Sequence, residues 1–181
     1  ETLESDPKQH YTGTITVIEK GKKKIFPKTF NLFDVVDGQQ RMTTLSMFII
    51  CIYERLKRIG TDRSILDDIF KNIVYHDQPI LALNDDSNKF YAQQIINGTV
   101  EQLPNKFKNK SERNLADAKR QISKFLDKHQ DENEIQELFE VLMSKFKINF
   151  YKLSDYFEVG IVFETMNNRG IELSQIDKVK N

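Results

Sequence analysis

The chain has 181 residues, and its 27 basic and 27 acidic side chains leave a formal net charge of zero. With 39% hydrophobic and 30% charged residues, one domain of ordinary size can bury a core and keep a well-solvated surface. Zero net charge argues against a protein held to DNA or to anionic lipid by overall charge alone, but it allows a local basic patch.

The single cysteine, Cys51, rules out a disulfide within the chain and fits a reducing, cytoplasmic location. Its apolar neighbours favour a buried, inert thiol. The longest apolar run, Met47–Tyr53, is far shorter than the ~20 residues of a membrane span, and no signal peptide is visible, so we expect no membrane partner. Because the chain lacks an initial Met and stops just after a predicted helix start, we expect a fragment of a longer protein.

The first part of the chain predicts a small sheet. Residues 11–19 are rich in β-branched side chains and predict a strand. Residues 20–24, with Gly21 and four lysines, predict a turn. Residues 25–26 and 32–36 predict one or two further strands, with Pro27 marking an edge or a break.

From Gln40 the apolar residues recur every three or four positions, which predicts a long helix that ends at Gly60. Further helices are predicted over 64–75 and 86–96, with a possible short strand at 80–83 between them.

After a loop at 103–110, two amphipathic helices are predicted over 115–126 and 135–146, the first more basic and the second more acidic. We interpret these charges as solvated faces rather than as a partner-binding patch. Residues 147–153 alternate like a strand, and Ser154 can cap a following helix.

One strand-to-helix corner, residues 37–44, gathers several polar groups. Backbone N–H groups at a helix N-terminus favour an anion such as phosphate, and Gly38 lets that backbone approach a ligand closely. Arg41 offers a planar fork for phosphate or carboxylate. Asp37 could bind a hydrated Mg²⁺ or accept a proton.

The remaining polar residues of the corner extend this pattern. Gln39 and Gln40 could orient water or bond a base or ribose, and Thr43 and Thr44 add hydroxyls on the first turn. The pattern is no P-loop, because Gly-x-x-x-x-Gly-Lys is absent. A simpler interpretation stays open: Asp37 caps the helix, Gly38 serves the turn and Arg41 joins a surface ion pair.

A second candidate segment runs from Phe163 to Gly170. Asn167 could be an ordinary helix C-cap, while Arg169 beside Gly170 could reach an anion. Asp177, further on, fits a capping residue better than a catalytic one.

Three stretches together are similar to a known family: Asp-Gly-Gln-Gln-Arg-Met-Thr-Thr-Leu at 37–45, Phe-Glu-Thr-Met-Asn-Asn-Arg-Gly at 163–170 and Leu-Ser-Gln-Ile-Asp-Lys-Val-Lys-Asn at 173–181. They resemble the N-terminal domain of GmrSD-type restriction endonucleases, a modification-dependent (type IV) prokaryotic family. Thr-Gly-Thr-Ile-Thr-Val-Ile-Glu at 12–19 fits the upstream strand of that family.

The resemblance implies a nucleotide-binding and NTP-hydrolysing domain in phage defence. It also implies a C-terminal His-Asn-His type nuclease domain, which this sequence lacks, and cleavage of modified DNA with NTP and a divalent metal such as Mg²⁺. By the same resemblance, Asp37, Gln39, Gln40 and Arg41 of the DGQQR motif are catalytic, Gly38 of that motif binds the nucleotide, and Asn167, Arg169 and Gly170 complete the pocket. We expect the hydroxyls of Thr43 and Thr44 to bind the nucleotide as well. Met42 and Val179 differ from the residues that are usual in the family at these positions, and neither difference changes a polar residue of the motifs.

The expected fold class is therefore α+β. A small mixed sheet of the ParB/sulfiredoxin-like type carries a largely helical insert at about 60–145 and a helical C-terminal part, all within one domain over 1–181. Two other functions stay open. A non-catalytic DNA-binding specificity module could use the lysines at 20–24 and 106–110, and an interaction scaffold could use the helices at 115–146.

Overall fold

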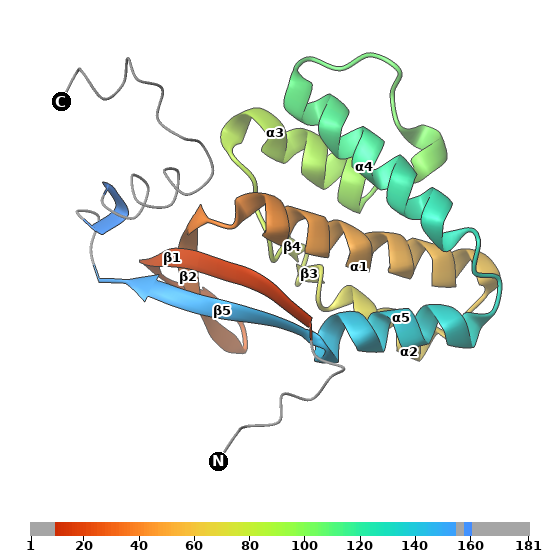
Figure 1. Ribbon diagram of the computed structural model, residues 1–181, viewed down its shortest axis with the longest axis horizontal. Coiled ribbons are helices and arrows are strands. Elements are labelled where there is room, and N and C mark those ends of the chain that lie inside the picture. The colour runs from red at the N-terminus through yellow and green to blue at the C-terminus, as the bar shows by residue number, and fades with distance from the viewer. Residues whose placement is uncertain (1–9, 155–157, 161–181) are drawn as a thin grey trace. The chain divides into compact units, whose positions relative to one another are not determined.

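The computed structural model describes residues 10–154 and 158–160 and has an α+β architecture, which confirms the predicted fold class (Figure 1). The chain divides into two compact units. We call residues 11–39 together with residues 147–154 and 158–160 the sheet unit, and residues 40–146 with His10 the helical unit. The helical unit thus begins at Gln40, well before the insert that we expected at about 60–145.

The sheet has the strand order β2-β1-β5. Its members are β1 (His10–Ile25), β2 (Lys28–Asp37) and β5 (Phe146–Leu153). β1 and β2 form an antiparallel hairpin. β5 runs parallel to β1, since Thr12 donates its hydroxyl hydrogen to the Lys147 carbonyl near the start of both strands, and Glu19 pairs with Lys152 further along both. The sheet is therefore mixed, as predicted.

The hairpin turn lies later than the sequence suggested. Residues 20–24 continue β1 instead of turning, and the chain reverses at Phe26 and Pro27. Gly21, with φ of +141°, sits at a register shift of the ladder, so it serves a β-bulge rather than a turn. The prediction of a turn at 20–24 was wrong because cross-strand pairing with β2 outweighs the local signal of glycine and lysines.

The helical unit is built around one long helix. Its elements are α1 (Gln39–Ile59), α2 (Arg63–Phe70), β3 (Val74–Tyr75), β4 (Gln78–Pro79), α3 (Asp85–Phe90), the π-helix η1 (Tyr91–Ile96), the 3-10 helix η2 (Val100–Gln102), α4 (Lys110–Leu126) and α5 (Glu132–Ser144). The predicted helices at 40–59, 86–96, 115–126 and 135–146 are confirmed in position, and Gly60, with φ of +86°, follows the end of α1.

Two predictions around α2 need correction. The helix expected over 64–75 ends at Phe70, and the strand expected at 80–83 lies at Gln78–Pro79 instead. His76 and Asp77 both have positive φ, which matches the backbone twist of a two-residue hairpin turn. Val74 pairs with Pro79 across this turn, so the last residues of the predicted helix form a strand of a short two-stranded ribbon instead.

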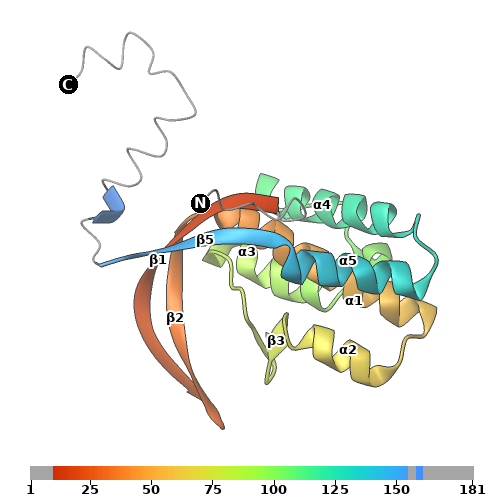
Figure 2. The ribbon, with the colours of Figure 1, turned by 60° about the horizontal axis from the view of Figure 1, so that its bottom comes forward.

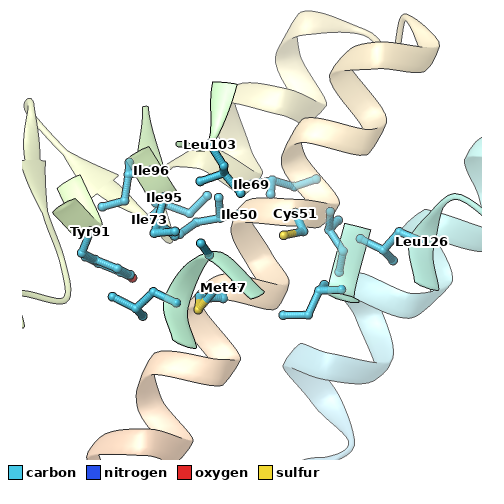
Figure 3. Close-up of a cluster of buried hydrophobic side chains, with 14 of the residues drawn as sticks. Met47, Ile50, Cys51, Ile69, Ile73, Tyr91, Ile95, Ile96, Leu103 and Leu126 are labelled. Carbon is cyan, nitrogen blue, oxygen red and sulfur yellow. The ribbon is translucent and has the colours of Figure 1, made fainter. Parts of the chain in front are cut away.

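The core of the helical unit lies between α1, the α3–η1 segment, α4 and α5 (Figure 3). Figure 3 shows Met47, Ile50 and Cys51 of α1 facing side chains of η1 and α4. Burial raises the pKa of the Cys51 thiol to about 11, so at neutral pH it stays protonated, as expected for an inert buried cysteine. In the described part of the chain, no helix has the length and apolar character needed to cross a membrane.

A lysine lies in this core. Lys119 of α4 is fully buried, and its ammonium group donates to Glu54 Oε1 at 2.6 Å, to the Ile95 carbonyl at 2.7 Å and to the Gly98 carbonyl at 2.5 Å. The Gln94 carbonyl lies at 3.4 Å as a fourth, weaker acceptor, so the buried charge is both paired and hydrogen-bonded. The ammonium thus connects α1 to the C-terminal end of η1. The last backbone carbonyls of a helix have no partner within the helix, and Lys119 supplies one here.

Candidate functional site

The polar corner singled out in the sequence is a strand, a one-residue turn and a helix. β2 ends at Asp37, Gly38 has φ of +86°, and α1 begins at Gln39. A positive φ costs an L-residue energy that glycine avoids, so the turn needs Gly38. Gly38 has no side chain with which to cap α1, and the first turn of α1 contains no acidic residue.

The two glutamines that follow differ in their surroundings. Gln39 folds back on the strand, where its Nε2 donates to the Val35 carbonyl at 2.8 Å. This bond fastens the turn to β2, and it gives Gln39 a positioning role that the sequence did not suggest. Gln40 is exposed, and its carbonyl accepts the hydroxyl hydrogen of Thr44 at 2.9 Å. Arg41 and Thr43 are half-buried on the same turns of α1.

Asp37 is half-buried at the end of β2. Its carboxylate accepts no hydrogen bond and joins no ion pair with any residue that the structure describes. The simpler interpretation, in which Asp37 caps the helix, therefore finds no bond to support it within the described residues. An acceptor with this freedom can take a ligand.

Thr16 lies directly opposite Asp37 in the β1–β2 ladder. Its side chain is fully buried, and its Oγ1 has no hydrogen-bond partner among the described residues. Buried hydroxyls are rarely left unsatisfied, so each such group calls for an explanation. Sequence reasoning treated Thr16 only as a strand residue, because no local signal shows which residue will pair with Asp37.

A register shift adjoins this pair. Thr16 pairs with Asp37 and Val17 with Val35, so Val36 is the extra residue of a β-bulge in β2. Bulges change the direction in which neighbouring side chains point, and they are common beside functional sites. The end of β2 thus has a bulge and the Asp37 carboxylate, with the buried Thr16 hydroxyl opposite in β1, and neither group has a partner among the residues that the structure describes.

A family model described as the N-terminal domain of the GmrSD restriction endonuclease matches residues 1–181. The chain belongs to this family. A search of curated proteins found no match. Restriction endonucleases act on DNA, so membership connects this GmrSD N-terminal domain to restriction systems and to DNA.

The second predicted segment of this GmrSD domain, with Asn167, Arg169 and Gly170, lies outside the described residues, as does Asp177. These positions stay predictions.

Among the residues that the structure describes, Asp37 is the carboxylate that the corner offers to a metal. The described residues contain no group of three or more His, Cys, Asp or Glu side chains that could hold a metal ion. Mg²⁺ does not require such a cage, because it keeps several waters and binds through one or two carboxylates together with substrate phosphates. The half-buried Asp37 carboxylate, which has no partner among the described residues, fits this kind of binding.

Proposed function

We propose that this GmrSD N-terminal domain binds and hydrolyses a nucleoside triphosphate at the turn between β2 and α1. In this way it would regulate a modification-dependent DNA restriction endonuclease. The observation that carries the proposal is the Asp37 carboxylate at the end of β2 together with Thr16 Oγ1 opposite it in β1, both without a partner among the described residues. They adjoin a helix start that has no side chain at its cap position.

The residues divide the chemistry between them. The first N–H groups of α1 and the guanidinium of Arg41 bind phosphate oxygens. Asp37 would hold a hydrated Mg²⁺, and the ion would supply positive charge that stabilises the phosphates. Gln40 orients the attacking water, while Gln39 keeps the turn in place through Val35. Phosphoryl transfer requires mainly positioning and charge stabilisation, which these groups supply.

The proposal is tested by thermal unfolding of this chain with GTP, UTP, CTP or ATP in the presence of Mg²⁺. A ligand at a hundred times its Kd stabilises the folded state by about 2.7 kcal/mol. We expect at least one nucleotide to raise the unfolding temperature of the wild type. Arg41→Ala should lose this increase while keeping its far-UV circular dichroism.

Arg63→Ala is the matched control. Arg63 is also an arginine at a helix start, and its side chain is 92% exposed in α2. This variant should keep the full nucleotide effect. Equal stabilisation of Arg41→Ala and wild type, or no stabilisation of the folded wild type by any of the four nucleotides, would contradict the proposal.

A further inference from the structure

The outer half of the β1–β2 hairpin extends past the third strand. β5 has 8 residues and lies beside the first part of β1, from Thr12 to Glu19, whereas β1 has 16 residues. From Lys20 onward the hairpin is a two-stranded ribbon that ends in the turn at Phe26 and Pro27 (Figure 2). We call residues 20–32 the arm.

The arm is strongly basic in a chain of zero net charge. It carries five lysines and no Asp or Glu, and all five lysines are exposed: Lys20, Lys22, Lys23, Lys24 and Lys28. Lys20, at the base, pairs with Asp34 at 3.3 Å. The other four lysines form a local positive patch of the kind that overall neutrality leaves possible.

The four outer lysines lie on both faces of the ribbon. Residues that pair directly across an antiparallel ladder share a face, and successive residues alternate between faces. Lys22 pairs with Asn31 and Lys24 with Thr29, which puts these two lysines on one face. Lys23 pairs with Phe30, and Lys28 pairs with Ile25, which puts the other two on the opposite face.

An aromatic residue lies at the tip. Phe26 is 81% exposed, and Pro27 beside it is exposed as well. A single exposed apolar residue is ordinary. Here, however, the ring marks the end of a ribbon whose exposed side chains are otherwise mostly polar or charged, with Lys24 and Lys28 close by in the sequence.

We propose that the arm enters a groove of double-stranded DNA, with lysines of each face meeting the phosphates of one groove wall and Phe26 packing against the bases. A major groove about 12 Å wide admits a two-stranded ribbon. Lysine–phosphate contacts supply affinity without sequence preference. An apolar side chain against a base step adds contact that does not depend on salt.

The distribution of charge favours DNA over an anionic membrane. A flat lipid surface would meet lysines of one face of the ribbon only, whereas a groove has phosphates on both sides. Membership in a restriction endonuclease family also favours DNA over a membrane, because DNA is the substrate of such enzymes. The inference concerns a surface separate from the residues of the proposed nucleotide site, so the two can fail independently.

The test is fluorescence anisotropy of this chain with a labelled duplex about two helical turns long, titrated at several salt concentrations. Each lysine–phosphate contact contributes about 0.9 to the slope of log K against log salt. Replacing the four outer lysines together (K22Q/K23Q/K24Q/K28Q) should reduce that slope by about 3.6. Because all four are exposed, the fold should survive, and circular dichroism checks this.

Two variant sets make the result specific. The charge-matched control K57Q/K89Q/K124Q/K128Q changes four exposed lysines of the helical unit outside 106–110 and should leave most of the slope intact. The arginine set K22R/K23R/K24R/K28R should keep the wild-type slope even if the glutamine set folds poorly. Phe26→Ala should weaken binding about tenfold at every salt concentration without changing the slope.

Three results would overturn the inference: equal slopes for the arm and control variants, a reduced slope in the arginine set, or binding by wild type to phosphatidylserine vesicles but not to the duplex. None of the arm variants should change the thermal stabilisation by nucleotide. A loss of DNA binding therefore stays distinguishable from a failure of the proposed nucleotide site.

Discussion

The two units use their polar groups differently. In the helical unit the buried ammonium of Lys119 has three close acceptors, and the charge stabilises the packing of α1 against α4 and η1. In the sheet unit the facing pair Thr16 and Asp37 has oxygens without partners among the described residues, and the arm exposes its lysines and Phe26. The fully bonded ammonium indicates a structural role, whereas a carboxylate and a hydroxyl that face each other without partners among the described residues indicate where a ligand can bind.

Removing the buried ammonium should have the largest effect on stability. Lys119→Met leaves the Glu54 carboxylate, which is only 14% exposed, without its partner, and it removes a donor from two backbone carbonyls. We expect the free energy of unfolding to fall by about 3–5 kcal/mol. Chemical denaturation measures this, with Lys124→Met on the exposed face of α4 as a control that should change little. A loss below about 1 kcal/mol would mean that the pair is not structural.

Two buried hydroxyls lack a partner among the described residues, and replacing either one should stabilise the fold. Only one of the two replacements should weaken nucleotide binding. Thr16→Val and Thr61→Val each remove a buried oxygen that has no partner among the described residues, so each should raise the free energy of unfolding by about 1–3 kcal/mol. Only Thr16→Val should also weaken nucleotide binding. If Thr16→Val is more stable and binds the nucleotide as tightly as the wild type, this hydroxyl takes no part in the site.

Gly38 and Gly60 form a second matched pair at the two ends of α1. Both have φ of +86°, so Gly38→Ala and Gly60→Ala should each cost about 1–2 kcal/mol of stability through backbone strain. The nucleotide Kd should rise in Gly38→Ala and stay unchanged in Gly60→Ala, because only the first lies at the proposed phosphate site. A similar Kd for both variants would count against close approach of a ligand at Gly38.

The smallest effect concerns pH. Burial raises the pKa of the Glu54 carboxyl, although the bond from Lys119 acts in the opposite direction. A folded-state pKa above the unfolded value gives stability that is present below the ordinary Glu pKa of 4.5 and is lost as pH rises through the folded pKa.

The Glu54→Gln variant has no carboxyl group at this position. Its free energy of unfolding should therefore not show this fall as the pH rises. Urea unfolding of both proteins from acid to neutral pH measures the difference, and Glu137→Gln, on an exposed part of α5, is the control. Parallel pH profiles for wild type and Glu54→Gln would refute the assignment.

The sequence predicted the helices well because their signal is local. The apolar spacing from Met42 to Ile59 follows the helix period, and Gly60 ends the helix as expected. The hairpin was harder to predict. A glycine among lysines is a local turn signal, yet pairing with β2 carries the strand to Ile25.

The candidate site was predictable in part for the same reason. The strand, Gly38 and the start of α1 follow one another along the chain, so their corner could be located. Thr16 could not be identified, because its place opposite Asp37 depends on the register of a hairpin with a bulge. The burial of Lys119 likewise depends on acceptors from α1 and η1 that are distant in the sequence.

Isothermal titration calorimetry of the wild type and Arg41→Ala with a magnesium nucleotide tests the central claim most directly. If the turn between β2 and α1 is the nucleotide site, the wild type should bind one nucleotide per chain. Arg41→Ala should bind at least about tenfold more weakly, as expected when a charge-assisted bidentate contact is lost. The same Kd for both proteins would contradict the assignment of the nucleotide to this corner.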